Sequence, residues 1–223
     1  MMAIACGMPR SATKSIAVLL KTLGFPAYHQ SVGTITHEGN FLPYLLPNEL
    51  DKWESWFRRK KTRMDGLIKD GNYFEANWEL ANVICVLYKY YPDLEFFVMV
   101  RDITGNANSL KHYREMDRIT YPVDHYARAW IRVYSFVCDQ LEHCKPKAYL
   151  VDFHKYTQGA YTDFLFDHFG IPRTEDNLKT ASKILSRKVN HRGGYGVYRI
   201  SKDLLSEAEE VRTRLESLCT PLS

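Results

Sequence analysis

Short apolar runs alternate with amphipathic stretches along most of the chain. Residues 94–100 are almost continuously apolar, and the run has the length of a strand that is buried on both faces of a parallel sheet. Shorter runs of the same kind predict further strands at 3–6, 27–32, 72–75 and 148–153.

Between these runs, apolar residues recur at the spacing of one helix face. Ile16, Leu19, Leu20 and Leu23 show this spacing before Gly24, a residue type that commonly ends helices. The same pattern predicts helices over residues 48–69, 80–90, 106–116, 123–143, 159–169 and 206–218. Alternating strands and helices indicate a parallel sheet with helices on both faces, a three-layer α/β/α arrangement. We expect a single domain over residues 1–223, because no repeat, low-complexity tract or linker interrupts the pattern.

Composition and charge narrow the range of functions. The 223 residues carry a net charge of +4 from 30 basic and 26 acidic side chains, which suits an anionic ligand but is too small to indicate nucleic acid. Five cysteines without a C-x-x-C pair are typical of reduced thiols, and the histidines show no metal-ligand spacing. The chain has no basic leader and no apolar run long enough to span a membrane, so we expect a soluble, cytoplasmic protein.

Ligands of such sheets bind at the carboxyl ends of the strands, and the first predicted strand is followed there by GMPRSATKS, residues 7–15. This loop places two cations, three hydroxyls and the start of a helix around one point, which is a suitable cradle for an anion. It is not a Walker A loop, because Lys14 lies seven residues after Gly7 instead of six, and Ala12 stands near the expected second glycine.

A second anion pocket is predicted after the central strand. Arg101 and Asp102 follow that strand directly, and Ser109 comes eight residues after Arg101. About two turns of helix would bring the Ser109 hydroxyl back toward the guanidinium.

These two segments together resemble the sulfotransferase family, whose members use 3′-phosphoadenosine 5′-phosphosulfate (PAPS) as donor and release adenosine 3′,5′-bisphosphate (PAP). The pattern G-x-P-R-S-[GA]-T-x-S, followed about ninety residues later by F-x-x-V-R-D-x-x-x-x-x-x-S, carries the resemblance. LLKTLGFPAYH, KYYPDLEFFVMVRD and YLVDFHKYTQGAYTDFLFDHFGIP are similar to stretches of small bacterial-type members, so the resemblance covers roughly residues 2–172. It implies a P-loop-like parallel sheet and no metal.

The resemblance also implies roles for individual residues. Arg101 and Ser109 match the family's 3′-phosphate pair, whereas the 5′-phosphosulfate loop is matched by Arg10, Ser11, Ala12, Thr13, Lys14 and Ser15. The chain departs from the family at Ala12, where glycine is usual, and at Lys14, where threonine, serine or arginine is usual. The late glycine-containing segment over the 3′-phosphate is matched loosely by RKVNHRGGYG, which offers Arg192 and Gly193.

Sulfuryl transfer would explain why the loop over residues 7–15 differs from the loop that binds a nucleoside triphosphate. A sulfuryl group in transfer carries less negative charge than a phosphoryl group, so fixed cations and N–H donors replace Mg²⁺. In this interpretation Arg10 and Lys14 neutralise the donor oxygens, while Thr13 and Ser15 donate hydrogen bonds to the 5′-phosphate.

The acceptor must lose a proton, and several residues are candidates for the base. His29 falls where the glutamate-using branches of the family place their base, and Glu75 and Asn77 fall near the position in the histidine-using branch; His37 and Glu38 are further candidates. We expect a small-molecule, glycan or lipid acceptor with a hydroxyl or amine, and the sequence does not predict an oligomeric state. Two alternatives stay open: a P-loop kinase that uses ATP and Mg²⁺, and a catalytically silent nucleotide-binding protein.

Overall fold

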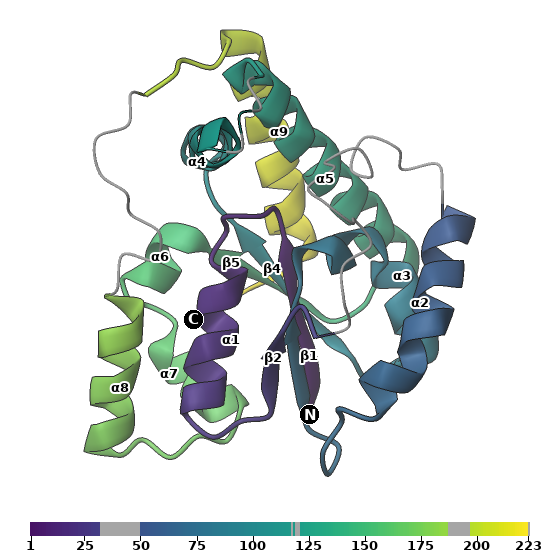
Figure 1. The fold of residues 1–223 in the computed structure, drawn as a ribbon, viewed down its shortest axis with the longest axis vertical. Helices are drawn as coiled ribbons and strands as arrows, with labels where there is room; N and C mark the ends of the chain where they lie inside the picture. The colour runs from purple at the N-terminus through teal and green to yellow at the C-terminus, as the bar shows by residue number, and fades with distance from the viewer. Residues whose placement is uncertain (32–49, 117, 119–120, 187–196, 223) are drawn as a thin grey trace.

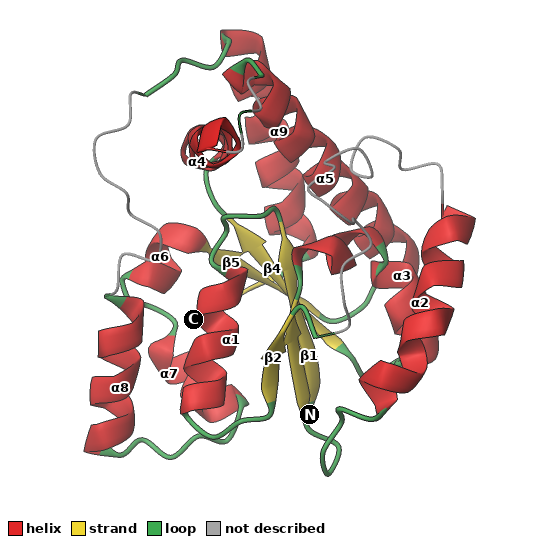
Figure 2. Cartoon of the chain, viewed as in Figure 1, coloured by secondary structure: helices red, strands yellow, loops and turns green. Residues whose placement is uncertain are grey.

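The computed structural model describes residues 1–31, 50–116, 118, 121–186 and 197–222. In this part of the chain, six parallel strands form one sheet in the order β2-β3-β1-β4-β5-β6. The strands are β1 (Met2–Gly7), β2 (Ala27–His29), β3 (Tyr73–Ala76), β4 (Glu95–Val100), β5 (Ala148–Asp152) and β6 (Thr220–Pro221). Helices cover both faces of the sheet, so the predicted α/β/α fold class is confirmed (Figures 1 and 2).

The amphipathic pattern predicted most of the helices, but several of their ends differ and two helices were missed. They are α1 (Thr13–Thr22), α2 (Leu50–Asp65), α3 (Ile84–Tyr90), α4 (Ile103–Met116), α5 (Val123–Cys144), α6 (Phe153–Thr157), α7 (Thr162–His168), α8 (Glu175–Leu185) and α9 (Lys202–Leu218), together with the 3₁₀ helix η3 (Trp78–Asn82). The helix predicted over 80–90 is divided at Val83, which lies between η3 and α3 with a non-helical φ of −133°. The helix predicted over 159–169 starts only at Thr162, because Gly159 forms a turn with a φ of +80° after α6. Helices α6 and α8 were not predicted; the Thr174 side chain caps α8 by accepting a hydrogen bond from the Asn177 N–H.

The sheet separates two hydrophobic cores. One face packs against α1, α7 and α8, and the other packs against α2, α3, α4, α5 and α9. Strands β1 and β4 lie at the centre of the sheet and are almost completely buried on both faces, as the continuous apolar run predicts. The described helices include none that is both long and apolar enough to cross a membrane.

The five cysteines, all within the described residues, are free thiols. Cys6, Cys138 and Cys219 are buried, and burial raises the pKa of Cys138 to about 11. These three thiols are therefore protonated at neutral pH and pack as small apolar side chains.

The loop that follows β1 starts at a close contact between the two central strands. Gly7, the last residue of β1, has a φ of +140°, and a Cβ atom at this position would lie 2.3 Å from the carbonyl oxygen of Met99 in β4. Only glycine fits both the backbone conformation and the space.

Substituting Gly7 should therefore destabilise the fold far more than substituting a glycine in open space. We expect Gly7→Ala to lower the free energy of unfolding by roughly 2–5 kcal/mol, because backbone strain and overpacking add. Gly24 has a φ of +90°, but a Cβ atom there would meet no neighbouring atom within 4 Å, so Gly24→Ala should cost only the strain, about 1–2 kcal/mol. Denaturant unfolding of both variants measures the difference; equal losses would contradict the close contact.

Candidate functional site

The loop between β1 and α1 has several features that suit an anionic ligand. Arg10 and Ala12 have φ values of 71° and 68°, in the left-handed region, and Ala12 is the N-cap of α1. Ala12 has no side-chain group to accept from the first N–H groups of the helix, which are the groups that bind anions at helix N-termini. Figure 1 shows this loop at the carboxyl end of the sheet, beside α4.

A buried tyrosine from α5 holds the loop against the sheet. The Tyr134 hydroxyl donates to the Met99 carbonyl in β4 at 2.6 Å and accepts from the Met8 N–H at 3.1 Å. Burial raises the pKa of Tyr134 to about 12, so the phenol stays neutral and remains a donor at physiological pH. Ser11, predicted as a ligand residue, is fully buried, and its hydroxyl donates to the Met8 carbonyl at 2.6 Å.

The remaining loop residues divide between the interior and the surface. Thr13 and Ser15 are buried in the first turn of α1, and Ser15 Oγ accepts a hydrogen bond from the Tyr156 hydroxyl at 3.3 Å. Lys14 is exposed between them. The side chains of Thr13 and Ser15 are therefore packed in the protein interior, whereas that of Lys14 faces solvent.

Arg101 follows β4 directly and contacts several neighbouring residues, but one N–H of its guanidinium has no acceptor among the described residues. Its guanidinium lies 4.6 Å from the ring centroid of Phe153, and its carbonyl accepts from the Trp130 indole N–H at 2.9 Å. Its Nε is buried and has no acceptor among the described residues. A Cβ at Gly105 would lie 2.9 Å from this Nε, so the glycine makes room for the guanidinium. A buried donor without a partner is costly, and an anionic ligand would satisfy it.

Two guanidinium groups come close together at this edge of the sheet. Burial lowers the pKa of Arg101, Asp102 raises it in part, and the positive charge of Arg10 lowers it further. Arg10 Nε donates to Ser109 Oγ at 3.1 Å, and the Arg10 guanidinium lies 5.5 Å from the Tyr113 ring centroid. The structure therefore brings the two predicted anion motifs together, with Ser109 in contact with Arg10; its pairing with Arg101 stays a prediction.

His29 and Glu75 lie on opposite faces of the sheet. They are in neighbouring strands, where His29 pairs with Ala76 and Glu75 pairs with Tyr28, so their side chains alternate to different sides. His29 is half-buried on the side of α1; burial lowers its pKa, and the nearby charge of Lys14 lowers it further. His29 is therefore mainly neutral at neutral pH, which is the form that accepts a proton.

Glu75 is fully buried and engaged by other groups. One carboxylate oxygen accepts from the Ser31 N–H at 2.9 Å, and the other accepts from the Ser31 hydroxyl and from the Tyr73 hydroxyl at 3.1 Å. Burial raises the pKa of this carboxyl group. Asn77, the neighbouring candidate, caps η3 by accepting from the Glu79 N–H at 3.0 Å. Both side chains thus have bonds that stabilise the end of β3.

Four predicted residues cannot be placed, and four residues that support the site were not predicted. His37, Glu38, Arg192 and Gly193 lie outside the described residues. Of the four supporting residues, Tyr134 and Trp130 reach the site from α5, which no local pattern connects to it. Asn106 and Phe153 lie close in sequence to the predicted motif and strand, but the sequence does not show which atoms they contact. Among the described residues, no group of three or more His, Cys, Asp or Glu side chains could hold a metal ion.

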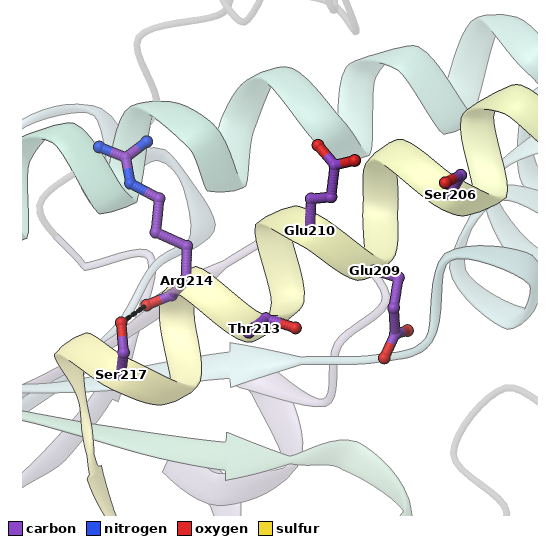
Figure 3. Close-up of a pocket in the computed structure, with 6 residues that line it drawn as sticks. All are labelled: Ser206, Glu209, Glu210, Thr213, Arg214 and Ser217. Carbon is purple, nitrogen blue, oxygen red and sulfur yellow. Dashed lines mark hydrogen bonds between the residues drawn. The ribbon is translucent and has the colours of Figure 1, made fainter.

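A hollow on the outer side of α9 differs in character from this site. Its lining comes from α9 alone, namely Ser206, Glu209, Glu210, Thr213, Arg214 and Ser217 (Figure 3). The Arg214 guanidinium already pairs with Asp139 at 2.7 Å and with Glu142 at 2.6 Å. With two exposed carboxylates and an engaged arginine, the hollow does not suit an anionic ligand.

The left-handed conformation of Ala12 leads to a stability prediction. An L-residue in this region costs about 1–2 kcal/mol, and glycine avoids that cost but loses more entropy on folding. We expect Ala12→Gly to raise the free energy of unfolding by up to about 1 kcal/mol, whereas Ala17→Gly inside α1 should lower it by about 1 kcal/mol or more. Thermal or denaturant unfolding gives both values, and a loss of stability in Ala12→Gly would contradict the strained cap.

The sequence matches a family of known proteins. A family model described as "Sulfotransferase domain" matches residues 3–189. Among curated proteins, none matches the sequence.

Solved sulfotransferase structures share the fold. The sulfotransferase domain of the olefin synthase from Synechococcus PCC 7002 is 12% identical, with a TM-score of 0.54 over 95% of this chain and 94% of that one. The sulfotransferase domain from the curacin biosynthetic pathway is 9% identical, with a TM-score of 0.54 over 96% of each chain. Sulfotransferase STF9 from Mycobacterium avium is 14% identical, with a TM-score of 0.53 over 97% of this chain and 75% of that one.

At these identities the structural likeness supports the fold, and the parallel P-loop-like sheet predicted from the sequence is confirmed. The family itself is established by the family model, which covers most of the chain. The protein therefore belongs to the sulfotransferase domain family.

Proposed function

We propose that this protein transfers a sulfuryl group from PAPS to a hydroxyl or amine of an acceptor. The observation that supports this most directly is the pair of guanidinium groups, Arg10 and Arg101, at the carboxyl ends of adjacent strands. One of them has a buried N–H without an acceptor among the described residues. Two neighbouring cations of this kind suit a ligand with two anionic groups.

The residues divide into two groups around such a ligand. Arg101 and Ser109 bind the 3′-phosphate, and the loop from Arg10 to Ser15 binds the 5′-phosphosulfate with its cations and the N–H groups of α1. PAPS supplies the sulfuryl group and a bisphosphate leaving group. Arg10 and Lys14 stabilise the negative charge that develops on the leaving oxygen, in the way that fixed donors stabilise oxyanions. Arg192 and Gly193 belong to this proposal by resemblance alone.

His29 is the better candidate for the base, although Glu75 stays in the proposal. His29 is half-buried, lies near Lys14 and is held neutral by burial and by that charge. Glu75, in contrast, is fully buried and already accepts three hydrogen bonds. A base needs a lone pair that reaches the acceptor, which favours His29.

The proposal extends to the domain organisation, the acceptor and the cellular compartment. We infer that residues 1–223 form one domain, since α9 and β6 pack on the same cores and sheet as the earlier elements. A small molecule, a glycan or a lipid is the proposed acceptor. The five free thiols favour a reducing compartment, and we propose the cytoplasm.

Ligand binding without metal tests the donor. We expect PAP to raise the melting temperature in the presence of EDTA, because a ligand at a hundred times its dissociation constant adds about 2.7 kcal/mol. AMP should raise it much less. Differential scanning fluorimetry measures these shifts, and strong stabilisation by ATP with Mg²⁺ but none by PAP would replace this proposal with the kinase alternative.

Substitution of Arg101 tests the 3′-phosphate pocket. Arg101→Ala removes a charge-assisted contact and should weaken PAP binding by roughly 1.5–3 kcal/mol, while weak AMP binding stays nearly unchanged. Arg173→Ala is the control, because Arg173 is an exposed arginine between α7 and α8 that pairs with Asp163 and Asp167. Calorimetric titration distinguishes the two nucleotides; equal losses for PAP and AMP would show that Arg101 supports the fold only.

The pH dependence of turnover tests the base. Since neutral imidazole accepts the proton, turnover should rise with pH through the pKa of His29, which lies below the ordinary value of about 6.5. His29→Ala should lower turnover by about 10²–10⁴ with little change in PAP affinity, and His143→Ala, at an exposed histidine of α5, should have no effect.

An NMR titration of the ligand-free protein separates the pKa from turnover. Lys14→Gln removes the nearby positive charge, so the pKa of His29 should move upward toward its ordinary value. If Glu75→Gln abolishes turnover while His29→Ala does not, the assignment of the base is wrong. Binding of PAP without turnover of PAPS on a broad acceptor panel would favour the silent nucleotide-binding protein.

A further inference from the structure

One face of α4 lies against the β1–α1 loop and contacts it at three positions. Asn106, Ser109 and Tyr113 follow one another at helical spacing along α4. The Asn106 amide donates to the Pro9 carbonyl at 2.9 Å, and Ser109 and Tyr113 both contact Arg10. Of these three residues, Asn106 contacts the backbone of the loop and not a side chain.

Asn106 is a polar residue in a fully buried position. Its exposed fraction is 0%, and its Oδ1 has no hydrogen-bond donor among the described residues. A half-satisfied amide costs stability at a site where an apolar side chain would fill the same volume. The Asn106 side chain therefore contributes little to stability except through its contact with Pro9.

That contact fixes the peptide group directly before Arg10. The Pro9 carbonyl belongs to the peptide unit that enters Arg10, and Arg10 has the left-handed φ of 71°. Holding this carbonyl fixes the plane of the peptide and so the direction in which Arg10 leaves the loop. The backbone of Asn106 is connected to the second motif, that of Arg101 and Ser109. Its N–H donates to the carbonyl of Asp102, the residue after Arg101, at 2.9 Å.

We propose that Asn106 is a positioning residue that sets the distance between the 5′-phosphosulfate loop and the 3′-phosphate pocket. This inference rests on the proposed function. Two anionic groups on one ligand bind more tightly than either alone when their two sites are held at the matching distance. Removing the link between the sites lowers that advantage and leaves each site able to bind a single phosphate.

Three nucleotides test the proposal: 5′-AMP, 3′-AMP and PAP, titrated into wild type and Asn106→Ala by calorimetry. We expect the dissociation constant of PAP to rise about 3- to 10-fold, while those of both monophosphates change less than about twofold. Asn106→Leu is the second variant, because leucine is nearly equal in volume, carries no charge and cannot donate to the Pro9 carbonyl, so it should give the same selective loss. Asn177→Ala is the matched control, since the Asn177 amide also donates to a proline carbonyl, that of Pro172 at 2.8 Å, and should leave all three constants unchanged.

Hydrogen–deuterium exchange of the ligand-free proteins gives a readout that needs no nucleotide. Exchange should become faster at residues 8–12 in the Asn106 variants and stay unchanged inside α1. Equal losses for the three nucleotides, or affinities and exchange equal to wild type, would overturn the positioning role. Failure of wild type to bind PAP at all would instead overturn the proposed function, and this inference with it.

Discussion

The arrangement of the site depends on the hydroxyl group of Tyr134. This group accepts from the Met8 N–H and donates to the Met99 carbonyl, so it joins the loop after β1 to the adjacent strand β4. It satisfies two backbone groups at a point where Gly7 has no side chain and the strands lie too close for one. Because the start of the loop is fixed to the sheet in this way, Arg10 and Ala12 can be held in the left-handed conformation.

Much of the fold could be predicted, because hydrophobic periodicity reports directly on burial. The strand over 94–100 and helix α1 were recognisable for this reason, and their order implied a parallel sheet. The elements that were missed have weaker signals. Helix α8 starts with the charged residues Glu175 and Asp176 after its Thr174 cap, and α6 is a helix of only five residues that ends before the turn at Gly159. Capping and turn chemistry decide these boundaries, and periodicity does not report on them.

The sequence predicted which segments form the candidate site, but not which side chains contact one another there. The carboxyl ends of β1 and β4 are adjacent, so the loop at Arg10 and the residue Arg101 were expected to meet. Which side chains touch depends on rotation and register, and a shift of one residue moves a side chain to the other face. This is why His29 and Glu75, both candidates for the base, lie on opposite faces of the sheet, and why the contact of Asn106 with Pro9 was visible only in three dimensions.

The position of β1 within the sheet has a consequence for how the chain folds. Strand β1 lies between β3 and β4, and its residues pair with partners about seventy and ninety positions later in the chain. Until those partners have been synthesised, the apolar residues Ala3, Ile4 and Ala5 have neither of their neighbouring strands to pair with. Such long-range pairing is slow to form and leaves an aggregation-prone segment exposed. Strand β1 can thus reach its final contacts only after β3 and β4 have been synthesised, and the same holds for the loop that follows it.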